Sequence, residues 1–170
     1  MKVAKFGGTS LASAVQIKKV CNIILSDPDR QIIVVSAPGK RDKNDTKVTD
    51  MLIACAESYL SNGNADEDVE KVTARYAEIA QELGLSDEIV ESIRNDIKGR
   101  FKITSSGREA FIDSLKAAGE DNCAKLVAAY LQSIGVDAKY INPKDAGLLL
   151  SNEYGNAQVL PQSYDNLKSL

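Results

Sequence analysis

Hydrophobic and polar positions follow two patterns along the chain: short apolar runs, which predict strands, and apolar residues at helical spacing, which predict helices between them. Residues 1–6 form a short strand pattern, and residues 31–37 form a nearly continuous apolar run of the kind that is buried in parallel sheets. Between them, from Leu11 to Ile24, apolar residues recur at helical spacing, and Asp27-Pro28 ends this pattern. The first part of the chain therefore predicts the order strand, helix, strand.

Three helices are predicted next. The first begins at Thr49 or Asp50, either of which can cap it. An amphipathic helix follows a loop at 61–65, and Ser86 caps a third helix, which ends near Ile97. The polar stretch 40–47 before them has no apolar periodicity and is expected to be an exposed, mobile loop.

Two further helices and two short strands are predicted after an interruption at Ser105–Gly107. One helix returns at about Glu109, and a longer helix begins at Gly119-Glu120. Val136–Tyr140 alternates as a strand would, and residues 157–160 indicate another short strand. Strands that alternate with helices predict an α/β fold, with a mainly parallel sheet sandwiched by helices and a helical insertion in the middle.

Composition and charge narrow the class of protein. A chain of 170 residues with 44% hydrophobic and 26% charged residues suits one globular domain. A formal net charge of -3 gives no electrostatic reason to expect binding to nucleic acid or to an anionic membrane surface. Without a signal-type or membrane-spanning apolar segment, the protein is expected to be cytoplasmic.

Two residue types restrict the chemistry. Histidine is absent, which excludes serine–histidine or cysteine–histidine catalysis and histidine-ligated zinc within this chain. The three cysteines, Cys21, Cys55 and Cys123, are far apart and odd in number. They are expected to be buried thiols in a reducing compartment.

The exit of the first predicted strand carries a candidate phosphate site. Here the chain reads Lys5-Phe6-Gly7-Gly8-Thr9-Ser10. Glycines allow the backbone to approach an anion closely, the first N–H groups of a following helix point toward it, and Lys5 adds a full positive charge. Thr9 or Ser10 can cap that helix. The same residues also fit a simple tight turn with a solvated lysine, and spacing alone does not separate the two interpretations.

Four elements together resemble the aspartate kinases of the amino-acid kinase family. They are the hexapeptide Lys5–Ser10, the strand end Val34–Ala37, the helix start Thr49-Asp50 and the Gly119-Glu120 helix. The resemblance covers residues 1–170 and implies the N-terminal part of an amino-acid kinase catalytic domain. It further implies an ATP-dependent enzyme that phosphorylates the β-carboxylate of L-aspartate and forms homo-oligomers as a full-length enzyme.

The resemblance assigns roles to particular residues. Lys5 would contact the transferring phosphates of ATP. The other nucleotide-binding residues would be Phe6, Gly7, Gly8 and Thr9. Ser36 and Thr49 would line the aspartate site, and Glu120 would hold the α-amino group. No metal ligand is expected in the protein, since Mg²⁺ would bind through the ATP phosphates.

Each substrate assignment has an ordinary structural alternative. Ser36 can simply end a strand, Thr49 can be only a helix cap, and Glu120 can complement a helix dipole. The segment Ser105–Glu109 also resembles the element that carries the substrate glutamate in the family. We favour Glu120 because its helix is expected to lead directly into the strand at Val136.

Further elements of an aspartate kinase are not in the sequence, including the segment with the substrate arginine and an acidic catalytic group. The chain alone is therefore expected to be inactive. Two alternatives stay open: a non-catalytic binding or assembly module, and a kinase for another small carboxylate substrate. The feedback inhibitor and any fused downstream domain cannot be inferred.

Overall fold

Two parallel strands and the segment that joins them form the N-terminal unit of the computed structural model, which describes residues 1–102 and 107–168. Strand β1 spans Lys2–Phe6 and β2 spans Arg30–Val35, with Phe6 opposite Val35 in the register. They are connected by a short 3₁₀ helix, η1 (Gly8–Leu11), and by α1 (Ala14–Leu25). The predicted order strand, helix, strand is confirmed.

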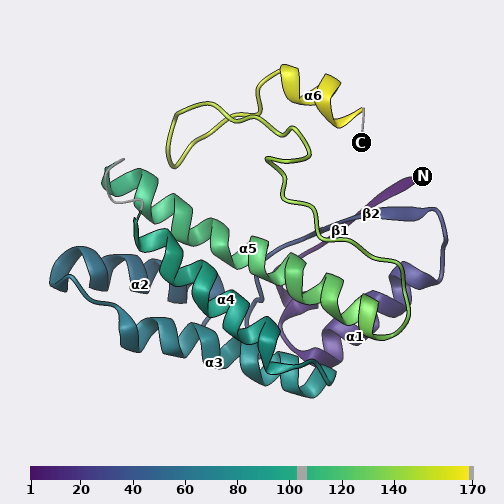
Figure 1. Cartoon of the computed structure of the whole chain (residues 1–170), viewed down its shortest axis with the longest axis horizontal. Coiled ribbons are helices and arrows are strands. Elements are labelled where there is room, and N and C mark those ends of the chain that lie inside the picture. The colour runs from purple at the N-terminus through teal and green to yellow at the C-terminus, as the bar shows by residue number, and fades with distance from the viewer. Residues whose placement is uncertain (103–106, 169–170) are drawn as a thin grey trace.

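Four long helices make up the middle of the chain. They are α2 (Val48–Asn62), α3 (Asp66–Leu83), α4 (Asp87–Arg100) and α5 (Arg108–Ser133). Helix α2 packs against α3 and α5, and α4 packs against the same two helices, so the four form a closed bundle (Figure 1). Helix α5 also contacts β2, and α1 contacts α3. The bundle therefore lies directly against the strands, and the predicted helical middle is confirmed.

One hydrophobic cluster runs through both parts of the fold. It begins under α1 with Leu11 and Ile17, and continues into the bundle through Leu52, Tyr76 and Phe111, all fully buried. The apolar positions predicted for α3 lie on its buried face, as an amphipathic stripe requires. The three cysteines are also buried and unpaired, as predicted.

The predicted helix caps are only partly correct. Helix α1 is capped by Ser13, whose hydroxyl accepts the N–H of Gln16, and not by Thr9 or Ser10. The glycine loop instead forms the separate 3₁₀ turn, after which Ser13 adopts an extended backbone and starts the α-helix. At α2, Lys47 is at the cap position, so Thr49 lies within the first turn. Ser86 is at the predicted cap position of α4, but its hydroxyl makes no capping hydrogen bond.

Helix α5 is continuous, which contradicts the predicted helix start at Gly119-Glu120. Both residues lie in the middle of a 26-residue helix. A glycine in a helix interior is unfavourable, because its flexible backbone loses more conformational entropy on folding than that of alanine, but it does not break the hydrogen-bond ladder. Glycines with positive φ angles follow the ends of α3 and α5, since Gly84 has a φ angle of 75° and Gly135 one of 85°.

The C-terminal segment contains less regular structure than predicted. Residues 136–140 form no strand, and the strand predicted at 157–160 is reduced to a single antiparallel bridge between Leu150 and Val159. Helix α6 (Gln162–Leu167) follows, and the Ser163 hydroxyl bonds both backbone groups of Leu149. An alternating sequence forms a strand only beside a partner, and the described sheet has just two strands.

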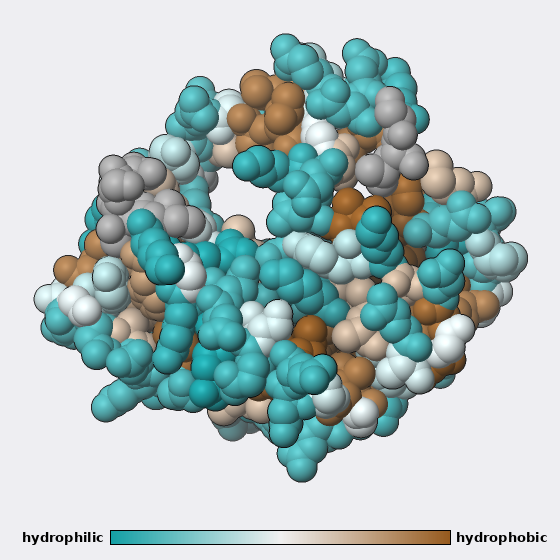
Figure 2. All heavy atoms as spheres, viewed as in Figure 1, coloured by the Kyte–Doolittle hydropathy of each residue, from teal (hydrophilic) through white to brown (hydrophobic). Residues whose placement is uncertain are grey.

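Apolar side chains remain exposed on the strands and on the C-terminal segment. Val3 and Val34 are 64% and 46% exposed, and Leu150, Val159 and Tyr164 are also exposed. Figure 2 shows the C-terminal segment arching away from the helices, with hydrophobic residues on it and an opening beneath it. Within the described ranges, no helix has both the length and the apolar character needed to cross a membrane.

We expect the 170-residue chain to associate with itself when expressed alone, because apolar patches of this kind and a two-stranded sheet edge favour intermolecular contacts. Sedimentation velocity at high micromolar concentration measures this. A strictly monomeric species with a cooperative thermal transition would show that these exposed residues need no cover.

Candidate functional site

The glycine loop leaves β1 and turns at once into η1. Gly7 adopts an extended backbone at the N-cap position, and the first hydrogen bond of η1 runs from the Ser10 N–H to the Gly7 carbonyl, at 3.0 Å. The N–H groups of Gly8 and Thr9 precede this bond and so have no partner within the helix. Lys5 is exposed on β1, and no ion pair in the described ranges includes it. A cation, backbone donors and a hydroxyl therefore lie in one short segment.

A second glycine explains why the loop contains Gly8. The Gly39 N–H donates to the Gly8 carbonyl at 2.8 Å, which brings the loops after β1 and β2 into contact. A Cβ atom on Gly8 would lie 2.8 Å from the Ala37 carbonyl oxygen, and one on Gly39 would lie 2.6 Å from the Gly8 carbonyl carbon. Only glycine fits at both positions. No pattern in the sequence indicates this pairing of Gly39 with Gly8.

Three backbone segments meet at the end of β2. A Cβ atom on Gly119 would lie 2.7 Å from the Ala37 Cβ and 3.7 Å from Val48 Cγ1. Gly119 therefore marks the point where α5 crosses closest to the strand exit and to the start of α2. The Tyr76 hydroxyl donates to the Gly119 carbonyl at 2.8 Å, and burial raises the pKa of Tyr76, so the donating proton is retained.

The three predicted substrate residues are next to this contact. Ser36 precedes Ala37, Thr49 follows Val48, and Glu120 follows Gly119. Ser36 directly follows β2, Thr49 is in α2 and Glu120 is in α5, so only tertiary packing at Ala37, Val48 and Gly119 brings these three parts of the sequence together. Ser36 and Thr49 are partly buried, whereas Glu120 is exposed, and no ion pair in the described ranges includes Glu120.

The Ser36 N–H also donates to the Phe6 carbonyl at 3.1 Å. The strand exit that carries Ser36 is thereby fixed directly beside the start of the glycine loop. The predicted nucleotide residues and the predicted substrate residues thus belong to one end of the two-stranded sheet, where ligands of α/β proteins commonly bind.

Glu109, the alternative substrate carboxylate, is at the N-terminal end of the same helix. It is exposed in the first turn of α5, ten residues before Gly119, which corresponds to about 15 Å along a helix. Its neighbour Arg108 pairs with Glu57 of α2. Ser105 and Ser106, the hydroxyl residues of this alternative element, lie outside the described residues.

The loop at 40–47 is mostly exposed and irregular, as predicted, but Asp45 anchors it. The Asp45 carboxylate accepts the backbone N–H of Arg41 at 2.8 Å and its Nε at 2.9 Å. Burial favours the neutral acid, but these donors outweigh that effect and hold the pKa of Asp45 below its ordinary value. Asp45 also forms an ion pair with Arg75 of α3, at 3.1 Å.

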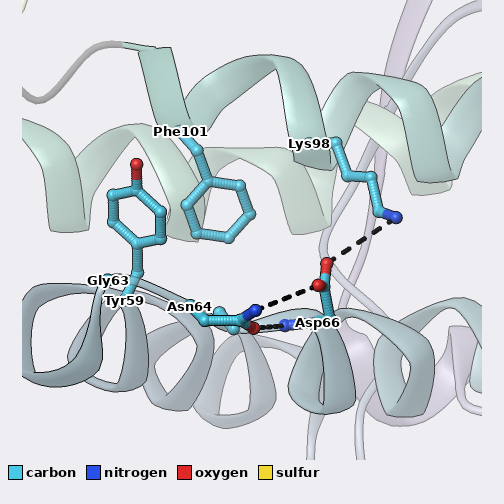
Figure 3. Close-up of a pocket in the computed structure, with 7 residues that line it drawn as sticks. Tyr59, Gly63, Asn64, Asp66, Lys98 and Phe101 are labelled. Atoms are coloured by element: carbon cyan, nitrogen blue, oxygen red, sulfur yellow. Dashed lines mark hydrogen bonds and ion pairs between the residues drawn. The ribbon is translucent and has the colours of Figure 1, made fainter.

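A shallow cavity of about 160 Å³ lies elsewhere, between the α2–α3 turn and the end of α4 (Figure 3). The Tyr59 and Phe101 rings lie side by side at one end of it. The Asp66 carboxylate accepts a hydrogen bond from the Asn64 amide nitrogen and pairs with Lys98 at 3.8 Å, and the Asp66 backbone N–H donates to the Asn64 amide oxygen. None of the predicted site residues lines it. The cavity is therefore separate from the glycine loop.

The residues at the strand ends suit an anionic ligand better than a directly bound metal. Gly7 has open space where a Cβ would be, and Lys5 and Thr9 are exposed beside it. In the described ranges, no group of three or more cysteine or acidic side chains is placed to hold a metal ion. The donor set therefore fits an anionic group.

These features define an α/β protein with a glycine-rich loop at the carboxyl ends of its strands. A family model described as the amino acid kinase family matches residues 1–170, so the chain belongs to that family. Aspartokinase 3 of Bacillus subtilis is 58% identical over 170 residues, which are all of this chain and 37% of that protein. The chloroplastic aspartokinase 2 of Arabidopsis thaliana is 31% identical over 95% of this chain and 30% of its own length.

Solved structures agree with the sequence matches. The Clostridium acetobutylicum aspartate kinase aligns with a TM-score of 0.61 and 35% identity, over 76% of this chain and 29% of that one. Escherichia coli aspartokinase III, in complex with lysine and aspartate, aligns with a TM-score of 0.80 over 98% of this chain and 36% of that one. At 23% identity, the latter match supports the fold. The predicted resemblance and fold class are confirmed, and the chain spans about a third of the length of these relatives.

The close contact at Gly119 predicts that Gly119→Ala destabilises the protein. The added methyl group meets the Ala37 side chain and must displace β2 or α5, which costs about 1–3 kcal/mol. Gly99→Ala in α4 is the matched control, because nothing lies within 4 Å of its Cβ position. This control is expected to stabilise by about 0.5 kcal/mol. Urea unfolding compares the two, and equal effects would show that Gly119 is not a packing constraint.

Proposed function

We propose that this chain is the N-terminal part of the catalytic domain of an ATP-dependent kinase that phosphorylates the β-carboxylate of L-aspartate. The observation that supports this most is the convergence at the strand ends. The contacts Gly8–Gly39 and Ala37–Gly119 place the glycine loop beside the segments that carry Ser36 and Glu120. The similarity to aspartokinases over the whole chain supports the choice of substrate.

Lys5 and the loop 6–9 bind and orient the nucleotide in this proposal. The lysine ammonium and the N–H groups of Gly8 and Thr9 stabilise negative charge on phosphate oxygens, which is the main protein contribution in phosphoryl transfer. ATP with Mg²⁺, when bound, supplies the transferable phosphoryl group. Gly7 allows the close approach, since a side chain there would occupy the open space above the loop.

Ser36, Thr49 and Glu120 hold aspartate. The Glu120 carboxylate binds the α-ammonium group, and the two hydroxyls donate to the substrate carboxylates and orient them. No base is needed, because the β-carboxylate of aspartate is ionised at neutral pH and is itself the nucleophile. The absence of histidine from the chain is consistent with this chemistry. We further propose a cytoplasmic, homo-oligomeric enzyme.

The proposal is tested on the complete protein encoded by the gene, by measuring ADP formation with aspartate and, separately, with other small carboxylates. Lys5→Ala is expected to lower kcat by about a hundredfold or more, because a stabiliser of transition-state charge is lost. Glu120→Ala is expected to raise KM for aspartate by an amount equivalent to about 2 kcal/mol, with a smaller effect on kcat.

Glu109→Ala is the matched control, since it removes an exposed carboxylate from the same helix. An aspartate defect in Glu109→Ala but not in Glu120→Ala would move the substrate site to the start of α5. ADP formation with a different carboxylate would identify another amino-acid kinase, and no ADP with any of them would favour a binding module.

The 170-residue chain alone is expected to show no aspartate-dependent ADP formation. It spans 37% of the length of its Bacillus subtilis relative, and losing several elements of one catalytic unit removes nearly all of its rate. A coupled ADP assay on the purified chain measures this. Activity that survives purification to homogeneity and is abolished by Lys5→Ala would contradict the prediction.

A further inference from the structure

Arg75, on α3, is a buried charged residue that the proposed reaction does not use. Its side chain is 4% exposed. The Nη2 group lies 2.7 Å from the Ala12 carbonyl, 3.1 Å from the Gly39 carbonyl and 3.1 Å from the Asp45 carboxylate. One nitrogen atom therefore contacts three segments that are far from Arg75 in the sequence: Ala12 is 63 residues away, Gly39 is 36 and Asp45 is 30.

These three segments surround the candidate site. Ala12 ends η1, the turn that carries Gly8 and Thr9. Gly39 is the residue whose N–H holds the Gly8 carbonyl. Asp45 anchors the loop 40–47, which leads from the strand exit to the first turn of α2. Arg75 is thus bonded to both sides of the Gly8–Gly39 contact and to the loop that follows it.

The buried position of Arg75 adds little to the stability of the fold. Its Nε and Nη1 atoms are buried and have no hydrogen-bond partner among the described residues. Burying an incompletely bonded guanidinium is unfavourable, and a buried ion pair adds little net stability over an apolar replacement. What the side chain does provide is one charged nitrogen, Nη2, within hydrogen-bond distance of two carbonyls and a carboxylate from three separate segments.

We propose that Arg75 is a positioning residue that fixes the glycine loop relative to Gly39 and the loop 40–47. It thereby holds the nucleotide-binding and aspartate-binding parts of the site at a fixed relative position. The catalytic consequence rests on the proposed function, whereas the positioning itself does not. Arg75 touches neither substrate in this proposal. Its effect is exerted through the backbone at Ala12 and Gly39 and through Asp45.

The test uses Arg75→Lys in the complete protein, which keeps the positive charge but replaces the guanidinium, and with it Nη2, by an ammonium group on a shorter side chain. Hydrogen exchange measured by mass spectrometry is expected to increase about fivefold or more in peptides that cover 8–12 and 38–46, with no change in α4 or α5. If the protein is an aspartate kinase, kcat/KM for both ATP and aspartate falls about tenfold or more, because small displacements of reacting groups are costly.

Arg94→Lys is the matched control. Arg94 also has a buried Nε atom without a described partner, and it pairs with Glu70 of α3 at 3.1 Å and with Glu91 of its own helix. It contacts neither loop, so its exchange and activity at the site are expected to stay within about twofold of wild type. Equal effects of the two variants, or an exchange increase spread evenly over the helices, would overturn the proposal.

Asp45→Asn is a second variant in case Arg75→Lys does not fold. It keeps the shape of the side chain and removes the charge that faces Arg75 and Arg41. Exchange is expected to increase at 40–46 and not at 8–12, and an unchanged 40–46 peptide would contradict the proposal. If the wild-type protein forms no ADP with aspartate, the proposed function fails, and the exchange data still decide the role of Arg75.

Discussion

The constraint on which the rest of the structure depends is close backbone contact at the ends of the two strands. Gly8 and Gly39 approach so closely that neither has room for a Cβ atom, and Gly119 brings α5 against Ala37 in the same way. A parallel pair with a helical crossover brings its carboxyl ends together, but side chains normally keep the following loops apart. These three glycines therefore set how near the glycine loop, the exit of β2 and α5 lie.

Helix α3 makes these contacts possible. Backbone carbonyls that are buried by close packing need hydrogen-bond donors, because water no longer reaches them. Consecutive residues of α3 supply such donors: Arg75 bonds the carbonyls of Ala12 and Gly39, and Tyr76 bonds that of Gly119. An apolar residue in place of Arg75 would remove the bonds to the Ala12 and Gly39 carbonyls, whereas the Gly119 carbonyl lies within the hydrogen-bond ladder of α5 and gains a second donor from Tyr76. The helical middle of the chain thus supports the strand ends chemically as well as by apolar packing.

Most of the fold was predictable because the helices carry strong amphipathic patterns and glycine stops, as Gly84 and Gly135 illustrate. The failures have physical reasons. Residues 136–140 alternate as a strand does, but a strand needs a neighbour and the described chain offers none. A helix start was predicted at Gly119-Glu120, whereas the ladder of α5 continues through both residues, because one interior glycine does not break it. The separate turn η1 was missed because Ser10 and Ser13 are equally good caps in sequence.

The candidate site was predictable only where its residues are contiguous. Lys5 to Thr9 form a local motif, so their spacing carried information. Gly39, Arg75 and Tyr76 act through contacts between distant segments, and no local pattern distinguishes them from an ordinary turn glycine, a surface arginine or a core tyrosine. Glu120 was chosen on the expectation that it begins a helix, and the structure removes that reason. The structure supplies another reason to consider Glu120, because the residue before it must be glycine for α5 to reach the exit of β2. An exposed carboxylate without a described ion pair, one residue from that contact, is free to meet an ammonium group there.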